Sequence, residues 1–580
     1  MAFEGRCHSV ARNRTRVERS NGMMRARPLV LVLSVLTTAV PLAGQSKVIV
    51  KVDAAAVGQP FPHTWAYFGY DEPNYTYAEN GQKLLSELGR LSPVPVYIRT
   101  HNLLTSGNGE GALKWGSTNA YTEDTAGHPV YDWSILDRIF DVILNAKARP
   151  LVEIGFMPEA LSTHPQPYRH SWPNGPLWTG WAYPPKDYQK WEDLVYHWVR
   201  HALGRYGEDE VRTWNWEVWN EPDIGYWQGT WEEYYRLYDH AAHAVKRAFP
   251  EARVGGPDST GPADAKAADF LRQFLEHCAQ GTNFATGTRG APLDFVTFHA
   301  KGNPSLVNDH VRMGIRRQLD SATGGFRIVS AFPEFKTLPI ILGESDPEGC
   351  AACSARQYPQ NAYRNGPLYP CYTAEALARL EELAAKYSIN LAGVVTWAFE
   401  FEGQPYFEGF RSLATNGIDK PVLNVFRMLG KMDGGQLPAV SDAALPLNSI
   451  LRSGVSDQAD VQALATGGKD KLSVMVWNYH DDEAAAPAAR VELILQNLPT
   501  RAVRLRVRDY RIDANHSNSF AAWKEMGAPQ QPTPEQYRRL ENAGQLEEMA
   551  PPTPLKASNG EWRMTLELPR HAVSLLEVAW

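Results

Sequence analysis

The chain contains 580 residues, of which 21 % are charged and 11 % are aromatic, and its formal net charge is −7. This length exceeds that of an ordinary single domain and allows a large hydrophobic core. The mildly acidic balance, together with the lack of a long basic run, argues against nucleic acid as a partner.

The first part of the chain has the pattern of an export signal. A basic start at 23–27 (MMRAR) precedes an apolar run at 29–40 and a small-residue exit at 41–44 (PLAG). The apolar run is too short to span a bilayer comfortably. We therefore expect cleavage near residue 44, a periplasmic or secreted mature protein, and no membrane partner once the signal is removed.

From about residue 64 to residue 430, strand-like segments alternate with helix-like segments. Strands are expected at 64–68, 94–104, 150–156, 214–221, 253–256, 293–299, 339–344 and 393–399. Helices are expected at 132–148, 187–205, after the Thr230/Glu233 capping box, and at 263–278, 306–319, 373–387 and 422–429. Eight such alternations predict an α/β fold, a parallel (β/α)8 TIM barrel with its active site at the carboxyl ends of the strands.

The pattern changes after residue 432. Short alternating runs at 472–479, 489–495, 503–507 and 571–578, separated by turn signals, predict a C-terminal β-sandwich, which a Pro- and Gln-rich segment at about 513–554 interrupts. The predicted organisation is an N-terminal extension with signal peptide (1–44), a strand joining the sandwich (45–62), the catalytic barrel (63–432) and a β-sandwich accessory domain (433–580).

Four of the five cysteines follow the predicted signal. Cys350 and Cys353 are separated by two residues, and Cys371 lies nearby. In an oxidising compartment we expect one disulfide among these three, although the spacing does not select the pair. A zinc site is the alternative, but neither a second CxxC nor a spaced histidine pair supports it.

Two glutamates end predicted strands. In WNWEVWNEPD at 214–223, Pro222 lacks an N–H and should stop the ladder, which leaves Glu221 at the carboxyl end of the strand. Glu344 ends the strand at 339–344, and a barrel brings such ends to one mouth. Two carboxylates that flank a scissile bond are what a glycosidase requires. The alternatives are a surface turn and a structural bridge to Arg or Lys.

Seven segments have a combination of motifs that is specific: 97–104 (YIRTHNLL), 150–162 (PLVEIGFMPEALS), 216–223 (WEVWNEPD), 254–259 (VGGPDS), 294–302 (DFVTFHAKG), 341–346 (ILGESD) and 516–536. Together they resemble glycoside hydrolase family 39, the family of retaining β-xylosidases and α-L-iduronidases. The resemblance implies Glu221 as acid/base, Glu344 as nucleophile and Asn220 as a partner of the sugar 2-hydroxyl. It also implies that His101 and His299 line the −1 subsite, although a lone histidine is more often a satisfied core residue.

Further side chains at strand ends suit a sugar site. Phe156 and Trp397 offer apolar faces to the C–H side of a pyranose, with core packing as the alternative for Trp397. Glu400 and Glu402 follow Trp397, where xylosidases of the resembling family hold the distal hydroxyls with acidic residues.

Two positions depart from the xylosidase pattern. Lys301 stands where family xylosidases typically have an aromatic residue, and Arg411, in GFRSL, stands where they have a glycine-rich run. Both look more like the iduronidase branch, in which basic side chains hold a uronic carboxylate by charge-assisted hydrogen bonds. The alternatives are a lysine that reaches solvent and an arginine in a structural salt bridge.

The loop at 165–185 is long, aromatic and Pro-rich, and such loops are often functional. Our hypothesis is that Trp172, Trp178 and Trp181 wall the entrance and restrict attack to chain ends. The alternative is that they only pack the loop.

The sequence as a whole predicts a retaining exo-glycosidase of small plant-type oligosaccharides or glycosides, with β-D-xylosidase leading, that needs no metal or organic cofactor. The alternatives are an α-L-iduronidase-like or other uronic-acid glycosidase, an α-L-arabinopyranosidase, and a silent carbohydrate-binding barrel. The sugar, the linkage and the oligomeric state are left open.

Overall fold

The structure is a computed structural model that describes residues 47–56, 58–171, 175–550 and 556–580. The predicted export signal at 1–44 lies outside these ranges. Within them, every helix is either too short or too polar to bridge a lipid bilayer.

Eight parallel strands of the described chain close into a barrel in the order β10, β11, β14, β15, β2, β3, β6, β9. In chain order they are β2 (Tyr67–Tyr70), β3 (Tyr97–Thr100), β6 (Arg149–Ile154), β9 (Asn215–Val218), β10 (Arg253–Ser259), β11 (Phe295–Lys301), β14 (Ile340–Asp346) and β15 (Leu391–Thr396). The predicted barrel is confirmed. The pattern was readable because strands buried on both faces form apolar runs, as in β14, which is buried along its whole length.

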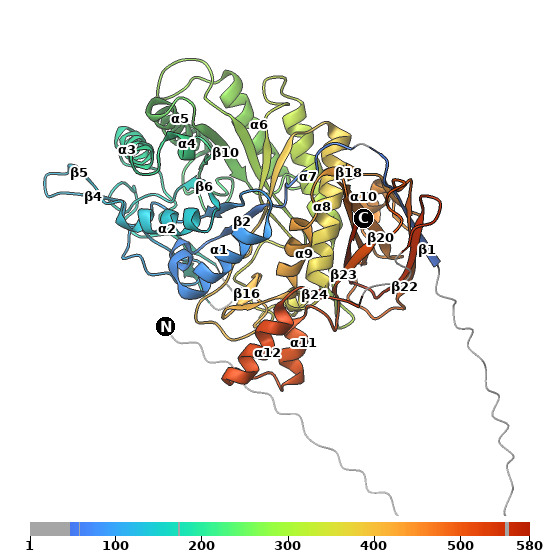
Figure 1. The fold of residues 1–580 in the computed structure, drawn as a ribbon. Coiled ribbons are helices and arrows are strands. Elements are labelled where there is room, and N and C mark those ends of the chain that lie inside the picture. The colour runs from blue at the N-terminus through green and yellow to red at the C-terminus, as the bar shows by residue number, and fades with distance from the viewer. Residues whose placement is uncertain (1–46, 57, 172–174, 551–555) are drawn as a thin grey trace, which may run out of the picture. The chain divides into compact units, whose positions relative to one another are not determined.

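Helices follow the barrel strands and surround them (Figure 1): α1 (Glu79–Leu91), α2 (Ser134–Asn145), α3 (Tyr188–Tyr206), α5 (Trp231–Ala248), α6 (Ala265–Gln280), α7 (Ile315–Ser330), α8 (Leu368–Tyr387) and α9 (Pro421–Gly430). The expected capping box begins α5: the Glu233 N–H donates to Thr230 Oγ1 (3.2 Å), and the Thr230 N–H donates to Glu233 Oε2 (2.7 Å). Leu237 and Ala241 then bury the inner face of α5.

The helix expected at 306–319 is wrong in its first part. An antiparallel hairpin of β12 (Ser305–Val307) and β13 (His310–Arg312) occupies these positions, and α7 begins only after it. Asn308 and Asp309 have φ of 47° and 66°, which is the two-residue turn that asparagine and aspartate favour between paired strands. The turn chemistry therefore overrides the apolar spacing.

Two sheets form the C-terminal sandwich. One contains β1 (Lys47–Asp53), β19 (Ala439–Ser441), β22 (Ala489–Gln496) and β25 (Trp562–Leu568); the other contains β18 (Gly435–Leu437), β20 (Asp460–Gly467), β21 (Lys471–Tyr479), β23 (Arg506–Ile512), β24 (Glu547–Glu548) and β26 (Val573–Ala579). β1 pairs in parallel with β22, and Val48, Val50 and Val52 of β1 are buried in the sandwich core. The strand expected at 503–507 is shifted, since β23 begins only at Arg506.

The Pro- and Gln-rich segment at 513–554 contains two helices that sequence reasoning did not expect, α11 (Ser519–Glu525) and α12 (Pro534–Gly544), which lie side by side (Figure 1). A second capping box, of Thr533 and Gln536, begins α12 and was a readable signal. The helices join the loop between β15 and α9 through a small apolar cluster of Phe407, Ile418, Ala522 and Leu540.

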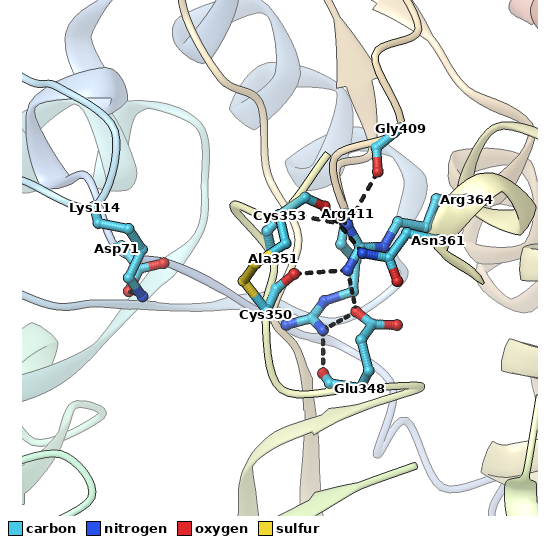
Figure 2. Close-up of a disulfide and its surroundings, with 10 residues drawn as sticks. All are labelled: Asp71, Lys114, Glu348, Cys350, Ala351, Cys353, Asn361, Arg364, Gly409 and Arg411. Carbon is cyan, nitrogen blue, oxygen red and sulfur yellow. Dashed lines mark hydrogen bonds and ion pairs between the residues drawn. A yellow bond between two sulfur atoms is a disulfide. The ribbon is translucent and has the colours of Figure 1, made fainter. Parts of the chain in front are cut away.

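Cys350 and Cys353 form a disulfide in the loop that follows β14 (Figure 2). The sequence had left the pair undecided among three cysteines. Cys278 and Cys371 are buried free thiols.

Candidate active site

Glu344 and Glu221 lie at the carboxyl ends of two barrel strands. Glu344 belongs to β14, and Glu221 follows the end of β9. The chain leaves β9 with left-handed backbone at Trp219 (φ 74°) and Glu221 (φ 46°). The Glu221 N–H donates to the Asp258 carbonyl (2.9 Å), which ties the turn to β10. The turn leaves the Glu221 side chain 17 % exposed, so it remains accessible from the mouth of the barrel.

A single histidine contacts both glutamates. His299 of β11 is fully buried; its Nδ1 lies 2.9 Å from Glu221 Oε1 and its Nε2 lies 4.0 Å from Glu344 Oε1. Nε2 is also 2.7 Å from Asp258 Oδ2. Burial alone would lower the pKa of His299, but the three neighbouring carboxylates hold it well above its ordinary value. The protonated ring is therefore favoured, and it lies between the carboxylates of Glu221, Asp258 and Glu344.

Cations surround Glu344. Lys301 Nζ lies 2.6 Å from Glu344 Oε2, while His101 Nε2 and Arg99 Nη1 lie 3.5 Å and 3.7 Å from Oε1. Burial alone would raise the pKa of Glu344, but Lys301, His299 and His101 hold it well below its ordinary value. Glu344 is thus kept ionised, as a carboxylate nucleophile must be.

Arg99 of β3 lies fully buried beneath these groups. Its guanidinium pairs with Glu217 on β9, Asp258 on β10 and Glu153 on β6. Nη2 also donates to Asn220 Oδ1 (3.2 Å). Burial raises the pKa of Glu153 to about 7 and that of Glu217 to about 8. Arg99 therefore joins four strands of the barrel through one charge network.

Sequence reasoning did not single out Arg99, Glu153, Glu217 or Asp258. The signal was available, because each is a charged residue within a buried barrel strand. Such residues are almost never fully buried unless they are paired. Charged residues on several strands of one barrel therefore indicate a shared network, although the pairing itself cannot be read from the sequence.

We expect Arg99→Met to lower the free energy of unfolding by about 3–5 kcal/mol, because it leaves buried carboxylates without their cation. Chemical denaturation followed by fluorescence measures this change. Arg272→Met is the matched control: Arg272 pairs with Asp269 at 46 % exposure, and such pairs contribute about 1 kcal/mol or less. An equal, small effect of both changes would contradict a stabilising network.

His101 of the loop after β3 is held by carboxylates on both sides. Its Nδ1 lies 2.9 Å from Asp71 Oδ1, and its Nε2 lies 3.3 Å from Glu153 Oε2. Burial alone would lower the pKa of His101, but its neighbouring carboxylates raise it to about 9. Lys114, which sequence reasoning also missed, forms an ion pair with Asp71. Asp71 therefore connects a lysine from a distant loop to the histidine beside Glu344.

Aromatic rings line the same end of the barrel. The Trp397 ring lies 4.3 Å from the His101 ring, between centroids, and Trp397 is 2 % exposed. Phe156 stacks on Tyr226 (5.9 Å between centroids, 8° between planes), and Tyr226 stacks on His170 (5.1 Å, 4°). The stack leads from the barrel interior to the loop at 165–185.

That loop contains a small hairpin of β7 (Arg169–His170) and β8 (Leu177–Trp178). Trp178 is 42 % exposed, whereas Trp181 is buried and lies 6.1 Å from the Trp115 ring. Trp172 lies outside the described residues. Trp178 thus presents its ring to solvent, whereas Trp181 packs inside the loop.

The two basic residues that suggested a uronic substrate differ in their surroundings. Lys301 Nζ is 2.6 Å from both Glu344 Oε2 and Asp346 Oδ2, and its side chain is 15 % exposed. Arg411 is fully buried, pairs with Glu348 and donates to the Trp397 carbonyl (3.0 Å). Arg411 has the contacts of the structural salt bridge that the sequence left open as an alternative.

Glu400 and Glu402 form contacts away from Glu344. Glu400 accepts the Gly417 N–H (2.6 Å), and burial raises its pKa to about 8. Glu402 accepts from Asn80 Nδ2 (3.2 Å). In the part of the chain that the structure describes, neither glutamate bonds to the residues that contact Glu344.

Comparisons with known proteins agree with this architecture. The family model described as glycosyl hydrolases family 39 matches residues 48–559. The β-xylosidase of Geobacillus stearothermophilus is 26 % identical over 495 residues, which cover 83 % of this chain and 86 % of that protein. The α-L-iduronidase of Homo sapiens is 27 % identical over 588 residues, covering 96 % and 82 %. A crystal structure of a monomeric β-xylosidase from Caulobacter crescentus CB15 matches the fold with a TM-score of 0.71 at 24 % identity, covering 92 % of this chain and 99 % of that chain.

Proposed function

The chain belongs to glycosyl hydrolases family 39, and we propose that it is a retaining exo-glycosidase of plant-type oligosaccharides, with β-D-xylosides as the leading substrates. The observation that carries the proposal is the arrangement of Glu221 and Glu344 at the carboxyl ends of separate strands around one buried histidine, His299. Two carboxyl groups of opposite roles are the requirement of glycoside hydrolysis.

We assign the roles by environment. Glu344, ionised by its cations, attacks the anomeric carbon while Glu221 protonates the leaving oxygen; Glu221 then activates the water that hydrolyses the glycosyl-enzyme. Glu221 suits proton transfer because its side chain, 17 % exposed at the mouth of the barrel, can reach a leaving oxygen. Asn220 supports the assignment, since its buried Nδ2 has no hydrogen-bond partner within the described residues and is available to a sugar hydroxyl.

The surroundings of the two basic residues favour a neutral sugar. Arg411 is fully buried, and Lys301 already contacts two carboxylates, so neither is a free partner for a uronic carboxylate. The second candidate, an α-L-iduronidase-like uronidase, is favoured by the partial exposure of the Lys301 side chain (15 %). An α-L-arabinopyranoside differs from a β-D-xyloside by one hydroxyl and is the third.

We expect the purified mature chain to hydrolyse aryl β-D-xyloside or α-L-arabinopyranoside with a kcat/KM about 100-fold or more above that for the α-L-iduronide, because an unmatched carboxylate would be desolvated beside Glu344. Side-by-side assays of the three aryl glycosides measure this ratio.

Lys301→Ala removes a contact of Glu344 and should slow all three substrates. The ratio of kcat/KM between substrates, rather than the rate itself, therefore distinguishes the candidates. A preference for the iduronide in the wild type that disappears in Lys301→Ala would move the chain to the acidic-sugar branch. No turnover of any of the three would favour a longer substrate or a carbohydrate-binding barrel.

The same proposal includes export with cleavage near residue 44, supported by the basic start and apolar run before it. It also includes a division of the chain near residues 62 and 432, supported by the parallel pairing of β1 with β22.

A further inference from the structure

A disulfide and a buried arginine fix the conformation of the loop that follows β14, the strand of Glu344. The Cys350–Cys353 disulfide closes a four-residue ring, and the Arg364 guanidinium lies against it (Figure 2). Arg364 is fully buried and donates to the carbonyls of Cys350 (2.6 Å), Cys353 (2.6 Å) and Gly409 (3.0 Å). Because the disulfide fixes the spacing of residues 350 and 353, it also fixes the two carbonyls that this buried cation needs.

Glu348 joins this loop to a second buried cation. Glu348 Oε1 lies 2.6 Å from Arg364 Nη2 and also pairs with Arg411 Nη1, as the converging side chains in Figure 2 show. The Arg411 N–H donates to the carbonyl of Ala351 (3.1 Å), inside the disulfide ring. Burial alone would raise the pKa of Glu348, but Arg364 and Arg411 lower it to about 2. One carboxylate therefore pairs with two guanidiniums, and both arginines contact the ring, Arg364 through its guanidinium and Arg411 through its backbone N–H.

Arg411 continues the network to Glu344. Its Nη2 lies 3.4 Å from Asp346 Oδ2, and the same oxygen is 2.6 Å from Lys301 Nζ, which is 2.6 Å from Glu344 Oε2. Asp346 Oδ1 accepts the Trp397 N–H (3.0 Å). The two contacts of Lys301 are charge-assisted hydrogen bonds, whereas Arg411 and Asp346 form an ion pair without a hydrogen bond. All of these groups are buried or nearly buried, a setting in which an unpaired group is costly.

We infer that Glu348 is a positioning residue for the nucleophile and acts through Arg411, Asp346 and Lys301. The Cys350–Cys353 disulfide holds Glu348 in place. Formation of the glycosyl-enzyme therefore depends on the oxidised state of these two cysteines. The inference rests on the proposed function in taking Glu344 as the nucleophile. It adds a supporting network behind the nucleophile to the conventional pair of acid/base and nucleophile.

The physical reason is geometric. Without the disulfide, the turn is held by the long hydrogen bond from the Cys353 N–H to the Cys350 carbonyl (3.4 Å) and by Arg364. When the two carbonyls move, Arg364 and Arg411 draw Glu348 and Asp346 with them. Lys301 then loses one of its two anchors, and its ammonium shifts from Glu344. Displacements of about 1 Å in such a constellation cost about 100-fold in rate, because reactive geometry is lost before binding is.

The disulfide is removed in two ways. The double change Cys350→Ser with Cys353→Ser removes it permanently. Dithiothreitol removes it reversibly: each molecule of the reductant gives two protons and two electrons, one of each to each cysteine sulfur, and becomes a cyclic disulfide. Cys350 is half-buried beside the exposed Gly349, so the bond lies near the surface. Cys278→Ala is the matched control, because it removes a buried thiol on α6, remote from the network.

The readout is the rate at which a 2-deoxy-2-fluoro glycosyl fluoride labels Glu344, measured by intact-mass and peptide mass spectrometry, with the sugar that the wild type hydrolyses best. We expect labelling to slow by about 10- to 100-fold in the double-serine variant, with the concentration for half-maximal rate changed by less than about threefold. Glu348→Gln, which keeps the shape and removes the charge, should show the same split, and Glu348→Asp should recover part of the rate. Cys278→Ala should label as the wild type does.

The outcomes are distinct. Failure of the wild type to be labelled at Glu344 would overturn the proposed function rather than the positioning role. Suppose that the wild type is labelled at Glu344 and that both the double-serine variant and Glu348→Gln are labelled at the wild-type rate. That result would overturn the positioning role alone. If the double-serine variant does not fold, the reductant-treated wild type and Glu348→Gln decide, and a slow rate that returns on reoxidation of the treated enzyme supports the inference.

Discussion

Glu344→Ala is expected to lower kcat/KM by about 10⁴-fold or more on every substrate that the wild type hydrolyses, because no other group can form the bond to the anomeric carbon. The cations around Glu344 should magnify the loss, since Lys301, His299 and His101 are arranged to stabilise a carboxylate that the variant lacks. Steady-state kinetics on aryl glycosides measure the effect. Glu232→Ala, at the exposed start of α5, is the matched control and should leave activity unchanged.

A small external anion provides the second half of this test. Azide fits the space vacated by the Glu344 carboxylate and should restore hydrolysis of a substrate with a good leaving group, giving a glycosyl azide of inverted configuration. The product configuration is read by nuclear magnetic resonance. Undiminished activity of Glu344→Ala, or azide products of retained configuration, would remove Glu344 from the role of nucleophile.

Glu221→Ala should separate substrates by their leaving groups. For an aryl glycoside with a poor leaving group we expect a loss of about 10²–10⁴ in kcat/KM, because the oxygen departs without a proton. For a dinitrophenyl glycoside, whose leaving group needs no proton, kcat/KM should stay within about tenfold of the wild type while kcat falls, since the second step lacks its base. A Brønsted plot of log(kcat/KM) against leaving-group pKa measures the difference, and an equal loss on all substrates would contradict the assignment.

The stereochemical course completes the test of this variant. In Glu221→Ala, azide should intercept the glycosyl-enzyme and yield a glycosyl azide of retained configuration. In the wild type, the first-formed sugar should also keep the configuration of the substrate, as expected for two carboxyl groups about 5–5.5 Å apart. A first product of inverted configuration would require a single displacement and a wider separation of the two groups.

Local sequence accounts for most of the elements. The barrel strands were found because strands covered on both faces are apolar runs, and α5 began at its capping box because the Thr230 and Glu233 side chains satisfy backbone N–H groups within one turn. The same reasoning failed at 306–319, where the Asn308-Asp309 turn decides the structure, and it overlooked α12 although its capping box was present. Both signals are short-range, so a closer reading of turn and cap chemistry would have found them.

The barrel, the β-sandwich and the choice of Glu221 and Glu344 as candidates followed from the sequence alone, because periodicity, caps and strand-end carboxylates are local properties of the chain. The partners of these side chains became visible only in the folded chain. The fold placed His299 between the two glutamates, linked Lys301 to Glu344 and Asp346, and turned Arg411 into the interior rather than toward the mouth of the barrel. These contacts join residues from separate strands and loops, and a buried charge takes whichever opposite charge the closure of the barrel brings near it.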